Sequence, residues 1–176
     1  MPLLTADLAM SHARLQVSDA NGDVPRLVTR NASDANKGGA TTDDLPCGSN
    51  SLQRGDNPVV LVVGETITVD IEETINHTGT FQMNFSAAGQ ANFTELTPPI
   101  DDPNVPLAGG PNPYQMTFTV PNTPCTDCTI QFVQVMGVEP DASYYKSCVD
   151  AIVTTADAPP AAIPSGFAVS KGASNE

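Results

Sequence analysis

The chain has 176 residues, 40% of them hydrophobic, which is enough for one well-buried domain and too few for two. Twenty acidic residues outnumber seven basic ones, and the formal net charge of −13 repels polyanions such as DNA over most approaches. We therefore expect no nucleic-acid partner. No apolar run approaches the roughly 18 residues of a membrane-spanning helix, so we expect no membrane insertion either.

The first eleven residues are similar to the end of a secretory signal peptide. Ala9 and Ser11 place small side chains at the third and first positions before His12, as signal peptidase requires. Residues 1–11 are therefore interpreted as a cleaved signal-peptide remnant, and His12 as the mature N-terminus. This predicts a secreted, periplasmic or cell-surface protein. The alternative is a frayed N-terminal arm in which His12 is an ordinary surface residue.

Short apolar segments, separated by sixteen Pro and thirteen Gly, predict strands rather than long helices. In the clearest segment Ile67, Val69 and Ile71 alternate with polar residues, which is typical of a strand with one buried face. About seven such segments predict an all-β sandwich with long loops. The expected strands are Ala13–Val17, Val59–Val63, Thr66–Ile71, Thr80–Ser86, Tyr114–Val120, Thr129–Met136 and Cys148–Thr154.

The C-terminal segment has a different composition from the rest of the chain. From Pro159 onward the residues are mostly small or polar, include further proline and show no periodicity. We therefore expect one sandwich domain over residues 12–156, with residues 157–176 as a disordered tail or linker.

Four cysteines can form two disulfides in three different pairings. Cys125 and Cys128 have the spacing of half a zinc site, but no second pair of this kind exists. Disulfides are therefore favoured, and they predict an oxidising compartment. If Cys47 joins Cys148, the closed loop of about 100 residues stabilises the fold by roughly 4–5 kcal/mol.

Five motifs occur in a characteristic order along residues 12–156. They are His12-Ala-Arg-Leu, Pro46-Cys47-Gly48, Asn76-His77-Thr-Gly-Thr-Phe81, Cys125-x-x-Cys128-Thr-Ile-Gln131 and Tyr145-Lys-Ser-Cys148-Val-Asp150. In this order the chain resembles lytic polysaccharide monooxygenases and their copper-binding relatives, in particular small bacterial monooxygenase-like proteins with a Gln-rich strand. The resemblance implies an antiparallel sandwich of the immunoglobulin or fibronectin-III type.

His12 and His77 are the only histidines in the chain. An N-terminal histidine offers two nitrogen donors, its α-amine and its Nδ1 atom, and a second imidazole completes a T-shaped set of three. Nitrogen donors in such an arrangement suit Cu(II), which heads the affinity order of divalent metals. The predicted cofactor is therefore copper, held by His12 and His77. A lone histidine in the position of His77 is otherwise most often a surface residue.

The resemblance also implies further site residues. Tyr145 matches an axial aromatic, and Asp150 is the carboxylate alternative found in some non-catalytic relatives. Gln134 or Gln131 matches a residue on the distal side of the metal, and strand alternation places these two on opposite faces. The ordinary interpretations are a core or edge tyrosine beside Cys148 and a surface carboxylate at Asp150.

The resemblance implies a copper monooxygenase that cleaves a polysaccharide oxidatively, with Gln134 and Tyr145 as catalytic candidates. The chain has no Trp, however, and only three Tyr and six Phe for stacking on sugar rings. The alternatives are a copper chaperone or scavenger without turnover, and a structural extracellular sandwich. Hydrolase chemistry is not expected, because Glu72-Glu73 and Asp101-Asp102 are adjacent pairs whose members point to opposite faces.

Overall fold

The computed structural model describes residues 13–16, 36–48, 54, 58–103, 111–138 and 140–156. The predicted signal-peptide remnant, His12 and the predicted tail lie outside these residues, and the domain bounds remain predictions. The described residues form nine strands. The strands are β1 (Ala13–Gln16), β2 (Asn36–Gly38), β3 (Val59–Val62), β4 (Thr66–Glu73), β5 (Thr78–Ser86), β6 (Thr94–Pro103), β7 (Asn112–Thr119), β8 (Cys125–Met136) and β9 (Ser143–Thr154).

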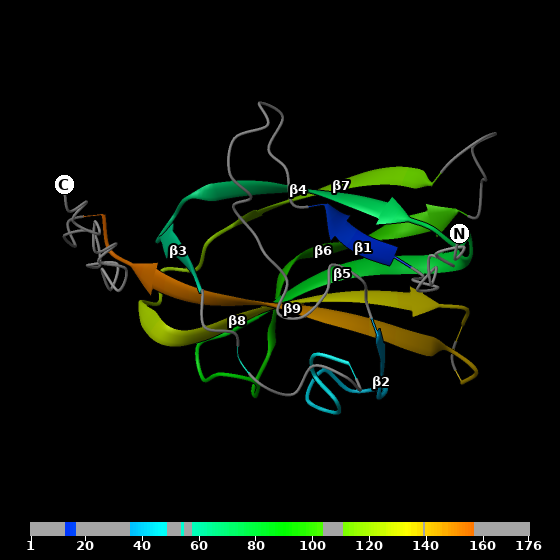
Figure 1. Ribbon diagram of the computed structural model, residues 1–176, viewed down its shortest axis with the longest axis horizontal. Helices are drawn as coiled ribbons and strands as arrows, with labels where there is room; N and C mark the ends of the chain where they lie inside the picture. Colours follow the sequence, from blue (N-terminus) through cyan, green and yellow to red (C-terminus); the bar gives the residue numbers. More distant parts are fainter. Residues whose placement is uncertain are drawn as a thin grey trace, which may run out of the picture.

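The strands form two sheets packed face to face. The smaller sheet has the order β1-β4-β7, and the larger has the order β2-β9-β8-β5-β6, with β3 added parallel to β9. The long strands of both sheets follow the long axis of the molecule (Figure 1). All other strand pairs are antiparallel. The predicted all-β sandwich is confirmed.

The core lies between the two sheets and follows from side-chain alternation along each strand. In β4 the buried positions are Ile67, Val69, Ile71 and Glu73, while the residues between them are exposed or half-buried. The larger sheet contributes the opposing apolar layer in the same way. Its most deeply buried large side chains include Phe81, Met83, Ile130 and Phe132.

Two strands were not predicted from the sequence. β6 contains Pro98, Pro99 and Pro103, and proline is normally excluded from strands because it lacks a backbone N–H group. Here β6 is an edge strand that pairs with β5 alone, and Pro98 and Pro99 lie where its register shifts. β2 has three residues, too few to show alternation, and pairing with β9 defines it.

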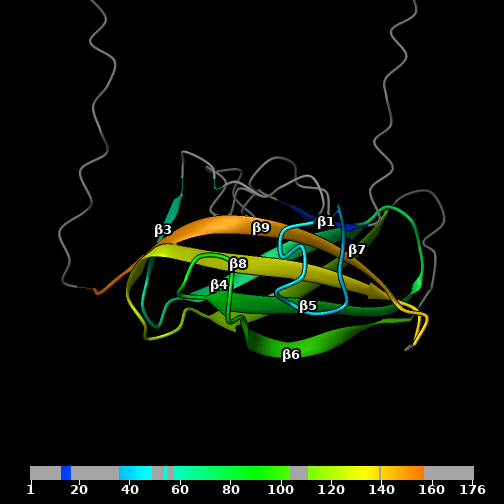
Figure 2. The same ribbon diagram turned by 90° about the horizontal axis from the view of Figure 1, so that it is seen from below.

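The outer face of β8 and β9, which points away from β4 and β7, carries the segment 36–48. Figure 1 shows this segment (cyan) below β9, and Figure 2 shows it in front of β8 and β9. The buried Lys146 donates from Nζ to the carbonyl oxygens of Thr41 at 2.6 Å and Asp44 at 2.8 Å. Gln131 donates to the carbonyl oxygens of Thr42 at 2.8 Å and Pro46 at 2.7 Å. Backbone carbonyls of this segment are thus satisfied by side chains of the sheet.

Two disulfides join the four cysteines, Cys47 with Cys148 and Cys125 with Cys128. The first holds the 36–48 segment against β9 across a sequence separation of 101 residues. The second spans three residues at the start of β8, where the register between β8 and β9 shifts. The prediction that the cysteines form disulfides is confirmed.

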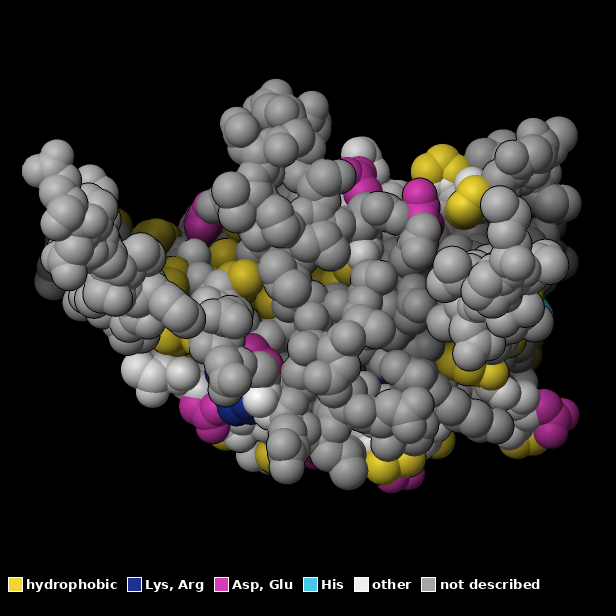
Figure 3. Space-filling view, in the orientation of Figure 1, with side chains coloured by type: hydrophobic (Ala, Val, Ile, Leu, Met, Phe, Trp, Pro, Cys, Tyr) yellow, Lys and Arg dark blue, Asp and Glu magenta, His cyan; other side chains and the backbone are white. Residues whose placement is uncertain are grey.

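Charge and hydropathy of the described surface add two observations. In the view of Figure 3, acidic side chains (magenta) are scattered over the described surface rather than gathered in one patch. Within the described ranges, no helix is long and apolar enough to cross a membrane.

We predict that the two disulfides contribute unequally to stability. The chain-entropy model assigns the Cys47–Cys148 disulfide about 4–5 kcal/mol, and a loop as short as that of Cys125–Cys128 about 2 kcal/mol. Urea unfolding of the paired Cys47→Ala/Cys148→Ala and Cys125→Ala/Cys128→Ala variants should therefore show the larger loss in the first. An equal or reversed order would contradict this assignment.

Candidate metal centre

His77 lies in the connection between β4 and β5, at one end of the sandwich. Its side chain is half-buried, and its backbone N–H donates to Oε1 of Glu73 at 2.7 Å. Glu73 is the last residue of β4, and its backbone lies opposite Ala13 of β1. Ala13 directly follows His12 in the sequence. The structure thus brings the beginning of β1 and the second predicted copper ligand to the same end of β4.

The carboxylate of Glu73 is the centre of a buried polar network at this end. Its side chain is 1% exposed. Besides the His77 amide, it accepts hydrogen bonds from Asn112 Nδ2 at 2.9 Å on Oε2 and from Gln134 Nε2 at 3.4 Å on Oε1. Asn112 also donates to Oδ1 of Asn76 at 3.0 Å. Since Asn112 lies on β7 and Gln134 on β8, the network joins the two sheets.

A second carboxyl group, Asp102 of β6, adjoins Glu73. Asp102 is 2% exposed, and its Oδ1 accepts a hydrogen bond from the hydroxyl group of Tyr114 at 2.9 Å. Burial raises the pKa of Glu73 to about 7, and the hydrogen bond and negative charge of Asp102 add to the rise, while donation from Asn112 and His77 opposes it. Burial, together with Asp102 and Glu73, raises the pKa of Tyr114 well above its ordinary value.

Sequence reasoning missed this carboxyl pair for a specific reason. Glu72-Glu73 and Asp101-Asp102 do point their members to opposite faces, since Glu73 and Asp102 are buried and Asp101 is exposed. One member of each pair, however, points into the sandwich, and there the two meet. The sequence does contain one indication of it: Glu73 continues the series of alternate buried positions Ile67, Val69 and Ile71.

Gln134 and Tyr145 lie on the inner face of the larger sheet. Gln134 pairs with Phe81 on one side and Tyr145 on the other, so the three side chains share a face. Gln134 is fully buried, and within the described residues its Oε1 atom has no hydrogen-bond partner. Tyr145 is half-buried and packs against the core. Both therefore lie in the same layer as the Glu73 network.

Asp150 and Gln131 lie on the outer face instead. Gln131 accepts a hydrogen bond from Asn84 Nδ2 at 2.9 Å and holds the 36–48 segment. The carboxylate of Asp150 is 3.3 Å from Nη1 of Arg54. Asp150 and Tyr145 are therefore on opposite sides of β9, and of the two axial candidates it is Tyr145 that shares the face of Gln134.

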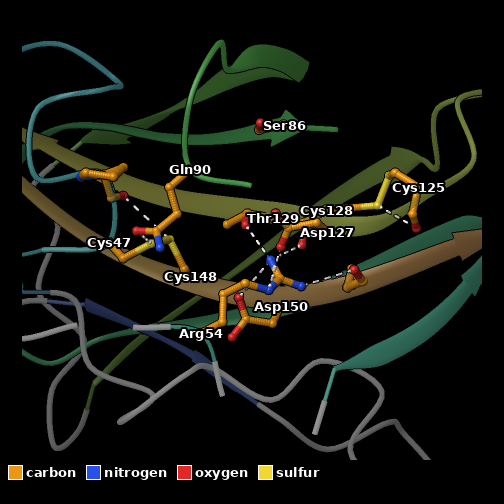
Figure 4. Close-up of polar contacts among 12 residues, drawn as sticks. Cys47, Arg54, Ser86, Gln90, Cys125, Asp127, Cys128, Thr129, Cys148 and Asp150 are labelled. Carbon is orange, nitrogen blue, oxygen red and sulfur yellow. Dashed lines mark hydrogen bonds and ion pairs between the residues drawn. A yellow bond between two sulfur atoms is a disulfide. The ribbon is translucent and has the colours of Figure 1, made fainter. Parts of the chain in front are cut away.

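Figure 4 shows how Arg54 fixes its part of the outer face. Its Nη1 donates to the carbonyl oxygen of Cys128 at 2.9 Å and to Oγ1 of Thr129 at 3.1 Å, and its Nε is 2.8 Å from Oδ1 of Asp127. With Asp150 as a further partner, the guanidinium group contacts acceptors on several sides. Arg54 is therefore a structural anchor, and Asp150 is one of its acceptors.

Among the described residues, no group of three His, Cys, Asp or Glu side chains is arranged to hold a metal ion. The predicted copper site uses His12, which lies outside those residues. The chemistry of the predicted donor set, two imidazoles and an α-amine, fits copper. Its assignment to His12, His77 and Tyr145 or Asp150 remains a prediction.

Several solved structures are similar to this chain. The catalytic domain of a lytic polysaccharide monooxygenase from Listeria monocytogenes aligns with a TM-score of 0.40 and 17% identity, over 60% of this chain and 64% of its own. A monooxygenase of this kind from Streptomyces lividans aligns with a TM-score of 0.38 and 15% identity, over 61% of this chain and 64% of its own. The chain resembles lytic polysaccharide monooxygenases.

A chitin-binding domain from Burkholderia pseudomallei is also similar, with a TM-score of 0.39 and 10% identity over 80% of each chain. The chain spans just under two thirds of the length of the Listeria and Streptomyces monooxygenase chains. No protein-family model and no curated protein sequence matches the chain.

We predict that Glu73 makes stability depend on pH. Its pKa is about 7 in the folded chain against 4.5 for the ordinary group. Between these two pH values the folded state retains a proton on Glu73 that the unfolded state has lost. The contribution of Glu73 is thus fully present below about pH 4.5 and is lost as the pH rises through about 7. The loss amounts to at most about 3 kcal/mol.

Urea unfolding of the wild type and of Glu73→Gln between pH 4.5 and 8 measures this effect. As the pH rises, the unfolding free energy of the wild type should fall relative to that of Glu73→Gln, because a glutamine side chain does not titrate. Glu72→Gln is the matched control, since it removes the same charge from the opposite side of β4. Parallel curves for the wild type and Glu73→Gln would show that Glu73 has an ordinary pKa.

Proposed function

We propose that the mature chain begins at His12 and binds one copper ion through the α-amine and imidazole of His12 and the imidazole of His77. The observation that carries this proposal is that Glu73 contacts both segments. Its backbone pairs with Ala13, and its side chain accepts a hydrogen bond from the His77 amide. His12 directly precedes Ala13 in the sequence. Glu73 therefore contacts both β1, which follows His12 in the sequence, and the backbone of His77.

We further propose that the protein is a secreted or periplasmic monooxygenase that acts on a polysaccharide. Copper, when bound, supplies the redox chemistry that oxidises the substrate. Tyr145, rather than Asp150, would be the further residue that holds the metal, because it is half-buried and lies on the inner face of β9 with Gln134. Gln134 is the proposed catalytic residue on the distal side of the metal, a proposal supported by the donation of its amide to Glu73. The two disulfides support an oxidising compartment.

A second candidate function is copper binding without turnover, as in a chaperone or scavenger. It is favoured by the described surface, on which the exposed large hydrophobic side chains are Leu45, Val60 and Val138, none of them aromatic. Flat aromatic faces are the usual platforms for sugar rings. Copper affinity without an oxidised product from any polysaccharide would select this candidate. A structural extracellular role stands if the secreted protein retains residues 1–11.

We predict that the chain beginning at His12 binds one equivalent of Cu(II), and that His12→Ala and His77→Ala each weaken binding by at least about 100-fold, since each removes an imidazole donor. Electron paramagnetic resonance with a competition titration measures both the coordination and the affinity. A chain that begins at Met1 is the control, because the α-amine is then absent from His12. Identical spectra for the wild type and both histidine variants would exclude this copper site.

A further inference from the structure

Glu73 is the residue at which the two segments of the proposed copper site meet. Its backbone lies opposite Ala13, and its Oε1 atom accepts the His77 amide at 2.7 Å. We infer that Glu73 is a positioning residue, which fixes His77 relative to the beginning of β1 and so sets the spacing of the copper ligands. This inference rests on the proposed function.

The surroundings of Glu73 restrict its side chain from several directions. Asn112 holds Oε2 from β7 in the smaller sheet, and Gln134 approaches Oε1 from β8 in the larger one. With the side chain 1% exposed, few other rotamers are open to it. The carboxylate is therefore a fixed point to which the His77 amide is tied.

The contact with Glu73 acts on a residue that lies outside the strands. Residues 74–77 connect β4 to β5 and belong to neither strand. The hydrogen bond from the His77 amide to the Glu73 carboxyl group, at 2.7 Å, lies at the short end of the normal range for N–H···O bonds. The contact between Glu73 and the His77 amide therefore restrains the backbone from which the imidazole projects.

The length of the Glu73 side chain and its charge can be separated by substitution. Glu73→Asp keeps the charge but is shorter by one methylene, about 1.5 Å, which takes the acceptor out of reach of the His77 amide. Glu73→Gln keeps the length and one acceptor oxygen for that amide. Its new NH₂ group would meet Nδ2 of Asn112, which also donates to Oδ1 of Asn76, so the amides of both Asn112 and Asn76 must rotate to restore these hydrogen bonds.

The test uses the chain beginning at His12, which retains every described residue, with Cu(II) alone as the probe. Glu73→Asp should lower Cu(II) affinity about 10- to 100-fold and alter the electron paramagnetic resonance spectrum, as loss of a group that orients a metal ligand does. Glu73→Gln should keep the wild-type spectrum and stay within about threefold in affinity, because the acceptor is retained. Glu72→Asp is the matched control on the other side of β4 and should equal the wild type.

The outcomes separate this inference from the proposed function. If the wild type binds no Cu(II), the proposed function is overturned, and the inference with it. If the wild type binds Cu(II) and Glu73→Asp matches it in affinity and spectrum, the inference alone is overturned. If thermal unfolding shows that Glu73→Asp does not fold, the scalar coupling across the hydrogen bond from the His77 amide nitrogen to the Glu73 carboxyl carbon decides; a measurable coupling supports the inference, and its absence overturns it.

Discussion

A carboxyl group buried between two sheets must be hydrogen-bonded, because an unpaired buried polar group costs roughly 1–3 kcal/mol and an unpaired charge costs more. Glu73 meets this demand with Asn112 from its own sheet, Gln134 from the opposite sheet and the His77 amide from the following connection. One end of the sandwich is organised by these contacts. Any side chain that replaced Glu73 would have to satisfy the same donors.

On the outer face of the larger sheet, cationic side chains are likewise held by hydrogen-bond acceptors. Lys146 is buried, and its lowered pKa reflects the loss of water around the ammonium group. Carbonyl oxygens of Thr41 and Asp44 replace that water. Arg54 anchors its own part of the sheet in a similar way, with Asp127 and Asp150 as acceptors. Both faces of β9 are therefore occupied, and Tyr145 and Asp150 belong to two separate environments.

Much of this fold follows from patterns that can be read along the chain. Period-two alternation predicted which faces of β4, β5 and β7 are buried, and the opposite placement of Gln131 and Gln134 followed from the same rule. β6 was missed because its prolines hide a strand that only an edge position permits. β2 was missed because three residues carry no period, and its pairing with β9 depends on residues more than 100 positions away.

For the candidate site, the sequence by itself determined the two histidines, the disulfide chemistry and the alternation of faces along the strands that it predicted. These are local properties, set by residue type and by backbone geometry over a few neighbouring positions. Only the tertiary structure decided that Glu73 meets Asp102, that the His77 amide is tied to Glu73, and that Tyr145 rather than Asp150 shares the face of Gln134. Such contacts depend on which strands pair and how the sheets pack, because residues distant in sequence become neighbours only when the chain closes over its core.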